Sequence, residues 1–168
     1  MKGFDQLLDV WSRICNSHQD WQLQIIGQGE EEGNLINIIK ERNIRNVTLL
    51  GQKNDVTVFY KSASLLVSTS ENEGLPMTMI EAQSFGLPIV SFDYETGPKD
   101  IITEGVDGYI ISQGPNRNQN MAKCIAELIC DKGLIEKMAV AAKESSNRFS
   151  MDTIGLKWEK IINELLGD

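Results

Sequence analysis

SLLVSTSENEGLPMTMIEAQSFGLPIVS, residues 64–91, contains two short apolar strand patterns with a loop and a helix pattern between them. The runs at 64–68 and 88–91 are short and rich in aliphatic residues, which is typical of strands buried in a parallel sheet. Gly86 suits the end of a helix. The segment therefore predicts a strand–helix–strand unit with its helix over 77–86.

The same alternation of strand and helix patterns extends over the rest of the chain. Strands are expected at 21–26, 47–50 and 108–111, and apolar residues at helical spacing predict helices over 4–17, 31–42, 54–61, 117–131, 132–147 and 151–166. This alternation predicts an α/β fold, a Rossmann-like parallel sheet with helices on both faces. At 168 residues the chain fits one domain, 1–168, in which 151–166 forms a closing amphipathic helix. The tryptophans at 11, 21 and 158 and the methionines at 77 and 79 are expected in the core and not in ligand recognition.

The charge and composition exclude several classes of protein. The formal net charge is −8 and basic residues are not clustered, so we expect no nucleic-acid partner. No segment reaches the roughly 18–20 apolar residues that span a bilayer. The start, Met1–Asp5, lacks the apolar run of a signal peptide. We therefore predict a cytoplasmic protein without a transmembrane segment.

The residues that commonly bind metals are sparse and poorly spaced. Cys15, Cys124 and Cys130 match no zinc-site spacing. His18 is the single histidine and lies in a polar run after a predicted helix, where a Ser-His-Asp triad is not expected. The sequence therefore predicts no metal site.

The glycines between the strand at 21–26 and the next helix resemble a dinucleotide-binding loop. Their spacing from Gly27 to Gly33 is GxGxxxG, however, instead of GxGxxG. Three consecutive glutamates, 30–32, also stand where a pyrophosphate would need bare backbone amides. We therefore interpret this segment as a strand-to-helix turn whose acidic residues favour the helix start.

Glu73 and Glu81 form the strongest candidate site. The two carboxylates flank a Gly-Leu-Pro turn and a helix start, which suits a ligand with hydroxyls at both ends and anionic charge between them, such as a nucleotide-diphosphate sugar. Gly74 has no side chain, so a ligand can approach its backbone closely. Pro76 lacks an amide hydrogen, but at the start of a helix that hydrogen would have no partner within the helix. Free amides around Met77–Met79 would then bind an anion. Alternatively, Glu73 caps backbone amides and Glu81 is a solvated helix residue; these residues alone leave both interpretations open.

A wider set of motifs accompanies this segment in a fixed order. They are Lys2–Leu8, the turn Ile26–Glu30, Val47–Gly51, Ser70–Pro76, Glu81–Pro88, Gly97-Pro98 and Asp107-Gly108. Together they resemble the carboxyl-terminal, donor-binding half of retaining GT-B glycosyltransferases of the group 1 family, which carry an E-x7-E motif. The resemblance covers nearly the whole chain.

The resemblance implies a role for each matching residue. Lys2, by itself an ordinary exposed lysine, would neutralise the donor diphosphate, and Glu73 would lie near the sugar hydroxyls; both are expected to be catalytic. Glu81 would hold the ribose hydroxyls. The other expected donor contacts are Gly51 and Gln52 beside the nucleobase, and Gly74, Leu75, Pro76 and Met77 at the sugar and phosphates. The family works without a bound metal, and a UDP-sugar is the expected donor.

The chain departs from the family pattern at its start. A strand and a Gly-Arg pair normally precede the lysine, so we expect that strand, the arginine and the amino-terminal acceptor domain to be missing. In a sheet of order 3-2-1-4-5-6 the missing strand is central, beside 64–68, and its gap would expose unpaired backbone. Either a second chain fills the gap, or the strands close up, or the chain is a fragment. Thr69 also replaces the family's usual proline, and Asp100 its usual glutamate.

These observations predict the donor-binding half of a retaining hexosyltransferase for bacterial surface polysaccharide or glycan assembly. Alone it should be inactive, because the acceptor domain, which could bring the protein to the inner face of the membrane, is missing. The exposed apolar side of 151–166 would face that domain or form a homodimer. The alternatives are a non-catalytic nucleotide-sugar-binding module of the same fold and a nucleotide-sugar epimerase fragment, which would need further catalytic residues.

Overall fold

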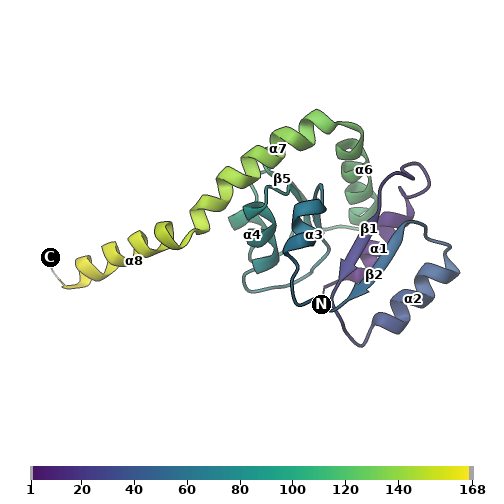
Figure 1. Ribbon diagram of the computed structural model, residues 1–168, viewed down its shortest axis with the longest axis horizontal. Coiled ribbons are helices and arrows are strands. Elements are labelled where there is room, and N and C mark those ends of the chain that lie inside the picture. Colours follow the sequence, from purple (N-terminus) through teal and green to yellow (C-terminus); the bar gives the residue numbers. More distant parts are fainter. Residues whose placement is uncertain (1, 167–168) are drawn as a thin grey trace.

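The computed structural model describes residues 2–166, so the ends of the predicted 1–168 domain lie outside the described residues. Strands and helices alternate along the chain (Figure 1). The strands are β1 (Leu23–Ile26), β2 (Val47–Gly51), β3 (Leu66–Ser68), β4 (Ile89–Phe92) and β5 (Gly108–Ile111). The helices are α1 (Phe4–Ser12), α2 (Glu32–Glu41), α3 (Thr57–Ser62), α4 (Met77–Ser84), α5 (Pro98–Ile101), α6 (Arg117–Cys130), α7 (Lys132–Ser145) and α8 (Met151–Leu166). The predicted α/β fold is confirmed.

The observed helices differ from the predicted ones where the chain forms turns or very short helices. The helix expected over 4–17 ends at Ser12 and continues as hydrogen-bonded turns, in which Ile14 and Cys15 remain buried. Helix α5 was not predicted, because its four residues are too few to show a helical period. A short 3₁₀ helix, Ser146–Phe149, likewise separates α7 from α8 without a sequence signal.

The parallel sheet is divided into two parts. β1 pairs with β2, and β3, β4 and β5 form a second sheet in that order. β1 and β3 are not hydrogen-bonded to each other, but residues of both line a single cavity. The gap therefore lies beside β3, where a central strand was predicted to be missing, and the strands have not closed over it.

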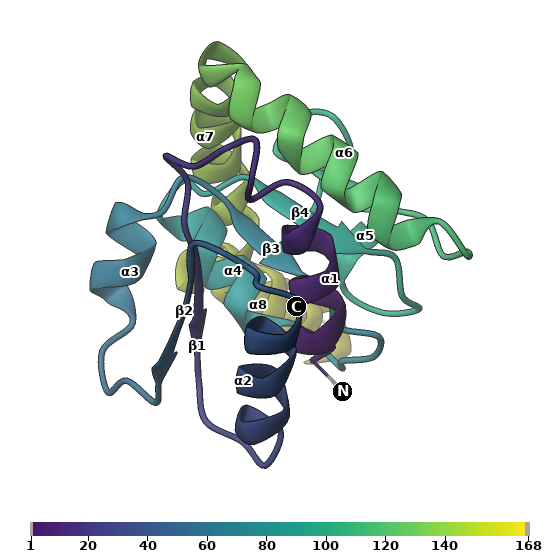
Figure 2. The same cartoon turned by 90° about the vertical axis from the view of Figure 1, so that its right-hand side faces the viewer.

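Two clusters of buried apolar residues cover the two faces of β4. Val90 and Phe92 join the larger cluster, which α1 and α6 complete. Ile89 joins the smaller one, with Met79 of α4 and Ile101 of α5. Figure 2 shows α1 beside α6 on one side of the molecule and α3 on the other. Because successive strand residues point to opposite faces, β4 is buried on both sides, as expected of an internal parallel strand.

The start of α1 is attached to the loop that follows β3. The Thr69 hydroxyl lies 2.8 Å from the carbonyl oxygen of Gly3 and 3.2 Å from that of Lys2, and donates to this pair. Gly3 has a φ of +65°, and a side-chain carbon there would overlap the carbonyl oxygen of Thr69. A proline at 69, the usual residue in the resembling family, has no hydroxyl for this contact.

Helix α8 extends away from the rest of the molecule (Figure 1), and none of its residues is buried. Its apolar side is therefore uncovered: Trp158 is 62% exposed, and Ile161 and Ile162 are about half exposed. The prediction that Trp158 is a core residue is wrong, because no residue of α8 is buried and the main packing contact of α8 is with the neighbouring 3₁₀ helix. Within residues 2–166, no helix combines the length and the apolar character that crossing a bilayer requires.

Replacing Gly3 with alanine tests the attachment of α1. We expect Gly3→Ala to lower the free energy of unfolding by about 2 kcal/mol, because it adds backbone strain and a clash with Thr69. Urea denaturation followed by circular dichroism measures the change. Gly29→Ala is the matched control, since a side-chain carbon there meets nothing within 4 Å. Equal stability of the two variants would contradict the described contact.

Candidate functional site

A cavity of about 830 Å³ lies between β1 and β3. Apolar side chains of α1 and of the strands, such as Trp11 and Leu66, form part of its lining. Polar side chains from the start of the chain, the loop after β3, and helices α3 and α4 also line it: Lys2, Tyr60, Ser70, Glu73, Thr78 and Glu81. In open α/β sheets, ligands bind at the carboxyl ends of the strands, where the loop after β3 begins.

Glu73 is an ionised acceptor at this cavity. Lys2 Nζ donates to Glu73 Oε1 at 2.9 Å, and the Ser70 hydroxyl donates to the same oxygen at 2.5 Å. Burial alone would raise the pKa of Glu73, but the hydrogen bonds from Ser70 and Lys2 outweigh it and lower that pKa below the ordinary 4.5. The carboxylate can therefore accept hydrogen bonds from ligand hydroxyls at neutral pH.

The backbone from Glu73 to Pro76 is fixed by the loop between β4 and α5. The Thr96 hydroxyl donates to the carbonyl oxygen of Glu73 at 2.6 Å. Gly97 has a φ of +115°, and a side-chain carbon there would lie 2.5 Å from Pro76 Cδ. Glycine is therefore required where the two segments pass, and the loop holds Glu73 in place ahead of α4.

Glu81 is held by an aromatic residue from another helix. The Tyr60 hydroxyl of α3 donates to Glu81 Oε2 at 3.0 Å. Burial and the charge of Glu81 raise the pKa of Tyr60, so its hydroxyl keeps its proton. The Tyr60 ring stacks on Phe85, with centroids 5.4 Å apart. An ionised carboxylate offers about four acceptor positions, so the bond from Tyr60 leaves Glu81 capacity for ligand hydroxyls.

The amides at the start of α4 are less available than the sequence predicts. The Met77 amide donates to the Leu75 carbonyl oxygen and the Met79 amide to that of Pro76, both at 2.9 Å. The prediction that the amides from Met77 to Met79 are free is therefore wrong for Met77 and Met79, because Pro76 has a non-helical ψ of 84° and the chain makes a tight turn there. Among residues 2–166, the amides of Leu75 and Thr78 have no acceptor. An anion at the start of α4 could therefore accept hydrogen bonds from these two amides but not from those of Met77 and Met79.

The remaining predicted donor contacts do not line the cavity: Gly51, Gln52, Gly74, Leu75, Pro76 and Met77. Gly51 ends β2 with a φ of +67° and accepts a hydrogen bond from the Gly27 amide at 3.0 Å. The Leu75 and Met77 side chains are about half exposed, which corrects the interpretation of Met77 as a core residue. The structure thus brings together the lysine and the two glutamates, and places the other predicted contacts outside their cavity.

Several polar residues at the site were missed by sequence reasoning. Ser70 lies inside the family motif, three residues before Glu73, and its spacing could have identified it. Tyr60 and Thr96 are distant in sequence from the carboxylate and carbonyl groups they bind, and each reaches the site from a different loop or helix. No local pattern indicates such contacts, because they depend on the packing of α3 and the β4–α5 loop.

The described residues contain no cluster suited to a metal ion. Within residues 2–166, no three His, Cys, Asp or Glu side chains are grouped so that they could hold one. The site carboxylates instead bind Lys2, Ser70 and Tyr60. The chemistry that the arrangement offers is therefore acceptance of ligand hydroxyls by two carboxylates, with the ammonium group of Lys2, whose side chain is 55% exposed, in the same cavity.

Comparison with known proteins shows where this architecture recurs. The sequence pattern of the family "Glycosyl transferases group 1" matches residues 1–145. A glycosyltransferase of unassigned specificity from Haemophilus influenzae is 36% identical over 162 residues, which is 96% of this chain and 45% of that protein. The amylovoran biosynthesis glycosyltransferase AmsD of Erwinia amylovora is 33% identical, again over 96% of this chain and 45% of that protein.

A solved structure extends the similarity to three dimensions. The pneumococcal O-GlcNAc transferase GtfA, crystallised with UDP and GlcNAc, superposes with a TM-score of 0.87 at 25% identity. The superposition covers 99% of this chain and 34% of GtfA. The chain thus spans less than half the length of these relatives.

The electrostatics of Glu73 can be tested by removing one hydrogen bond. Ser70→Ala should raise the pKa of Glu73, because the Ser70 hydroxyl makes the largest contribution that favours the ionised carboxylate. NMR titration of the side-chain carboxyl carbon measures this. Ser84→Ala is the control, since Ser84 donates to a backbone oxygen. An unchanged Glu73 pKa would contradict the geometry.

The same lowered pKa has a consequence for stability. Because the folded pKa of Glu73 lies below the unfolded value, its stabilisation is present above pH 4.5 and lost as the pH falls through the folded pKa. The Ser70→Ala variant should therefore lose less stability than the wild type over this acidic window.

Proposed function

The chain belongs to the group 1 glycosyltransferases, as a carboxyl-terminal portion of the GT-B fold, and we propose that it is the donor-binding half of a retaining enzyme. One observation carries the proposal: Lys2, Glu73 and Glu81 line the same cavity, beside the loop that follows β3. A cation in one cavity with two carboxylates that can accept hydroxyls suits a nucleotide sugar, whose diphosphate lies between its ribose and its hexose.

The donor in this proposal is a uridine-diphosphate sugar. Support comes from the solved relative GtfA, which holds UDP. Glu81 would accept hydrogen bonds from the ribose hydroxyls, with the Tyr60 hydroxyl fixing the carboxylate at 3.0 Å. Glu73 would accept bonds from the sugar hydroxyls, held by Ser70 and by the contact of Thr96 with its carbonyl oxygen.

Donor binding would redirect Lys2. Without ligand, its ammonium group is paired with Glu73 at 2.9 Å. A diphosphate carries more negative charge than one carboxylate, so Lys2 would turn to the phosphates and leave Glu73 to the sugar. In the transition state the same ammonium group, with the free amide of Thr78, which also lines the cavity, would stabilise the charge developing on the leaving diphosphate.

In this proposal, the whole enzyme completes the site with parts outside this chain. The matched relatives are about twice as long, and the gap between β1 and β3 leaves room for a strand. The uncovered apolar side of α8 would pack on the acceptor domain of a cytoplasmic enzyme that assembles surface polysaccharide or glycan. A homodimer is the other occupant that would cover this side of α8.

Binding of a donor to the chain tests this function. Calorimetry with UDP-glucose and UDP-N-acetylglucosamine should show binding that weakens at least tenfold, about 1.4 kcal/mol, in both Glu73→Ala and Glu81→Ala. The reason is that each variant leaves ligand hydroxyls without an acceptor. Glu136→Ala, in an exposed position of α7, is the control and should bind as the wild type does.

Two results would overturn parts of the proposal. If Glu73→Ala and Glu81→Ala bind the nucleotide sugars as tightly as the wild type, the cavity is not the donor site. If the variants weaken binding but the whole protein transfers no sugar, the alternative of a non-catalytic nucleotide-sugar-binding module is correct. Transfer by residues 1–168 alone, at the rate of the whole protein, would contradict the need for an acceptor domain.

A further inference from the structure

Arg117 occupies a position that helix energetics disfavour. It is the first residue of α6, where the positive end of the helix dipole repels a cation. Its side chain is nevertheless only 21% exposed, and its guanidinium lies 4.8 Å from the ring centroid of the fully buried Phe92. Tertiary contacts must therefore hold Arg117 in this place.

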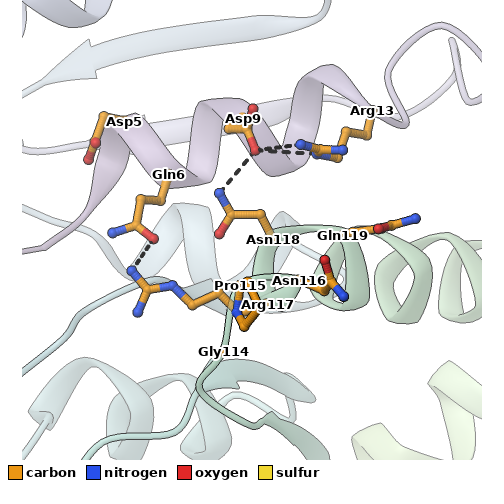
Figure 3. Close-up of a pocket in the computed structure, with 10 residues that line it drawn as sticks. All are labelled: Asp5, Gln6, Asp9, Arg13, Gly114, Pro115, Asn116, Arg117, Asn118 and Gln119. Atoms are coloured by element: carbon orange, nitrogen blue, oxygen red, sulfur yellow. Dashed lines mark hydrogen bonds and ion pairs between the residues drawn. The ribbon is translucent and has the colours of Figure 1, made fainter.

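The guanidinium joins α6 to the loop that follows β3. Arg117 Nη2 donates to Glu71 Oε1 at 2.6 Å and to Gln6 Oε1 at 2.5 Å. Gln6 Nε2 in turn donates to the same Glu71 oxygen at 2.8 Å. Arg117 and Gln6 line a polar pocket of about 420 Å³. In Figure 3 the side chain of Arg117 points toward that of Gln6 on α1. The three side chains form a closed set of hydrogen bonds among three segments of the chain.

The same guanidinium reaches the loops that follow the neighbouring strands. Arg117 Nη1 donates to Gln113 Oε1 at 2.5 Å, and Gln113 Nε2 donates to the carbonyl oxygen of Asp93. Glu71 follows β3, Asp93 follows β4 and Gln113 follows β5. Arg117 therefore joins the loops at the carboxyl ends of three adjacent strands, directly or through Gln113, at the edge of the sheet where we propose the donor site.

We propose that Arg117 is a positioning residue of the donor site, which holds Glu71 and neutralises its charge so that Glu73 and Lys2 keep their binding geometry. The step from Arg117 to donor affinity rests on the proposed function. Glu71 lies two residues before Glu73, and Ser70, which binds the Glu73 carboxylate, directly precedes Glu71. An anchor at Glu71 therefore fixes the backbone that presents both groups.

Charge compensation gives the anchor a second effect. The hydrogen bonds from Arg117 and Gln6 lower the pKa of Glu71, so it carries a negative charge in the loop that also presents Ser70 and Glu73. With Arg117 present, this charge is paired. Without Arg117, the unpaired Glu71 carboxylate would add negative charge to a loop that has to bind an anionic donor.

The variants that test this proposal separate two roles of Arg117: the hydrogen bonds of its guanidinium and the packing of its side chain on Phe92. Arg117→Met keeps an apolar stem over Phe92 and removes the guanidinium. We expect it to weaken UDP-sugar binding about tenfold and to speed hydrogen exchange of the amides from Glu71 to Gly74, while circular dichroism shows that the variant is still folded. Arg117→Lys should recover part of the affinity. One ammonium group can neutralise Glu71, but it cannot reproduce the hydrogen bonds that the two guanidinium nitrogens make to Gln6 and Gln113 at the same time.

The double variant and the control decide the outcome. Arg117→Met combined with Glu71→Gln should bind more tightly than Arg117→Met alone, because it removes the unpaired carboxylate. Arg42→Ala, which loses an ion pair with Asp9 away from the loop, should change neither the affinity nor the exchange of residues 71–74. Wild-type affinity and exchange in Arg117→Met would overturn the proposal. If the wild type binds no UDP-sugar, the proposed function fails, and the exchange rates alone decide whether Arg117 positions the loop.

Discussion

The structure depends on the contact between the first residues of the chain and the loop after β3. The carbonyl oxygens of Lys2 and Gly3 accept hydrogen bonds from the Thr69 hydroxyl, and the Lys2 ammonium group forms an ion pair with Glu73. These contacts lie at the gap between the two parts of the sheet, where α1 packs on both α2 and α6. The larger apolar cluster joins the two parts in the core, and the helix start and the loop after β3 connect them at the site, where a continuous sheet would use a ladder of backbone hydrogen bonds.

The site follows directly from that connection. Since α1 begins at the loop after β3, its preceding lysine is placed within reach of Glu73, and α4 brings Glu81 to the same cavity. The ion pair between Lys2 and Glu73 satisfies both groups when no ligand is bound, at little cost because Lys2 is more than half exposed. An anionic ligand can therefore displace the carboxylate from the ammonium group without leaving either charge buried and unpaired.

Sequence reasoning worked where the determinants are local. The strand and helix patterns that predict the α/β fold depend on residues close together in the chain, and the resemblance to the group 1 family depends on the order of short motifs. It could not identify Tyr60 or Arg117, whose partners Glu81 and Glu71 lie 21 and 46 positions away. It also mistook Trp158 for a core residue, because an amphipathic pattern shows that a helix has an apolar side and not whether this chain covers it.

The central claim is that the two glutamates and Lys2 form one wall of a donor-sugar site at the carboxyl edge of the sheet. The most direct measurement is an NMR titration of the isotope-labelled chain with a UDP-sugar, followed residue by residue through amide chemical shifts. This account predicts that the largest changes fall on residues 2–3, 70–81 and the neighbouring Tyr60. It is contradicted if no amide shifts, or if the largest changes fall on the glycine-rich turn at 27–33.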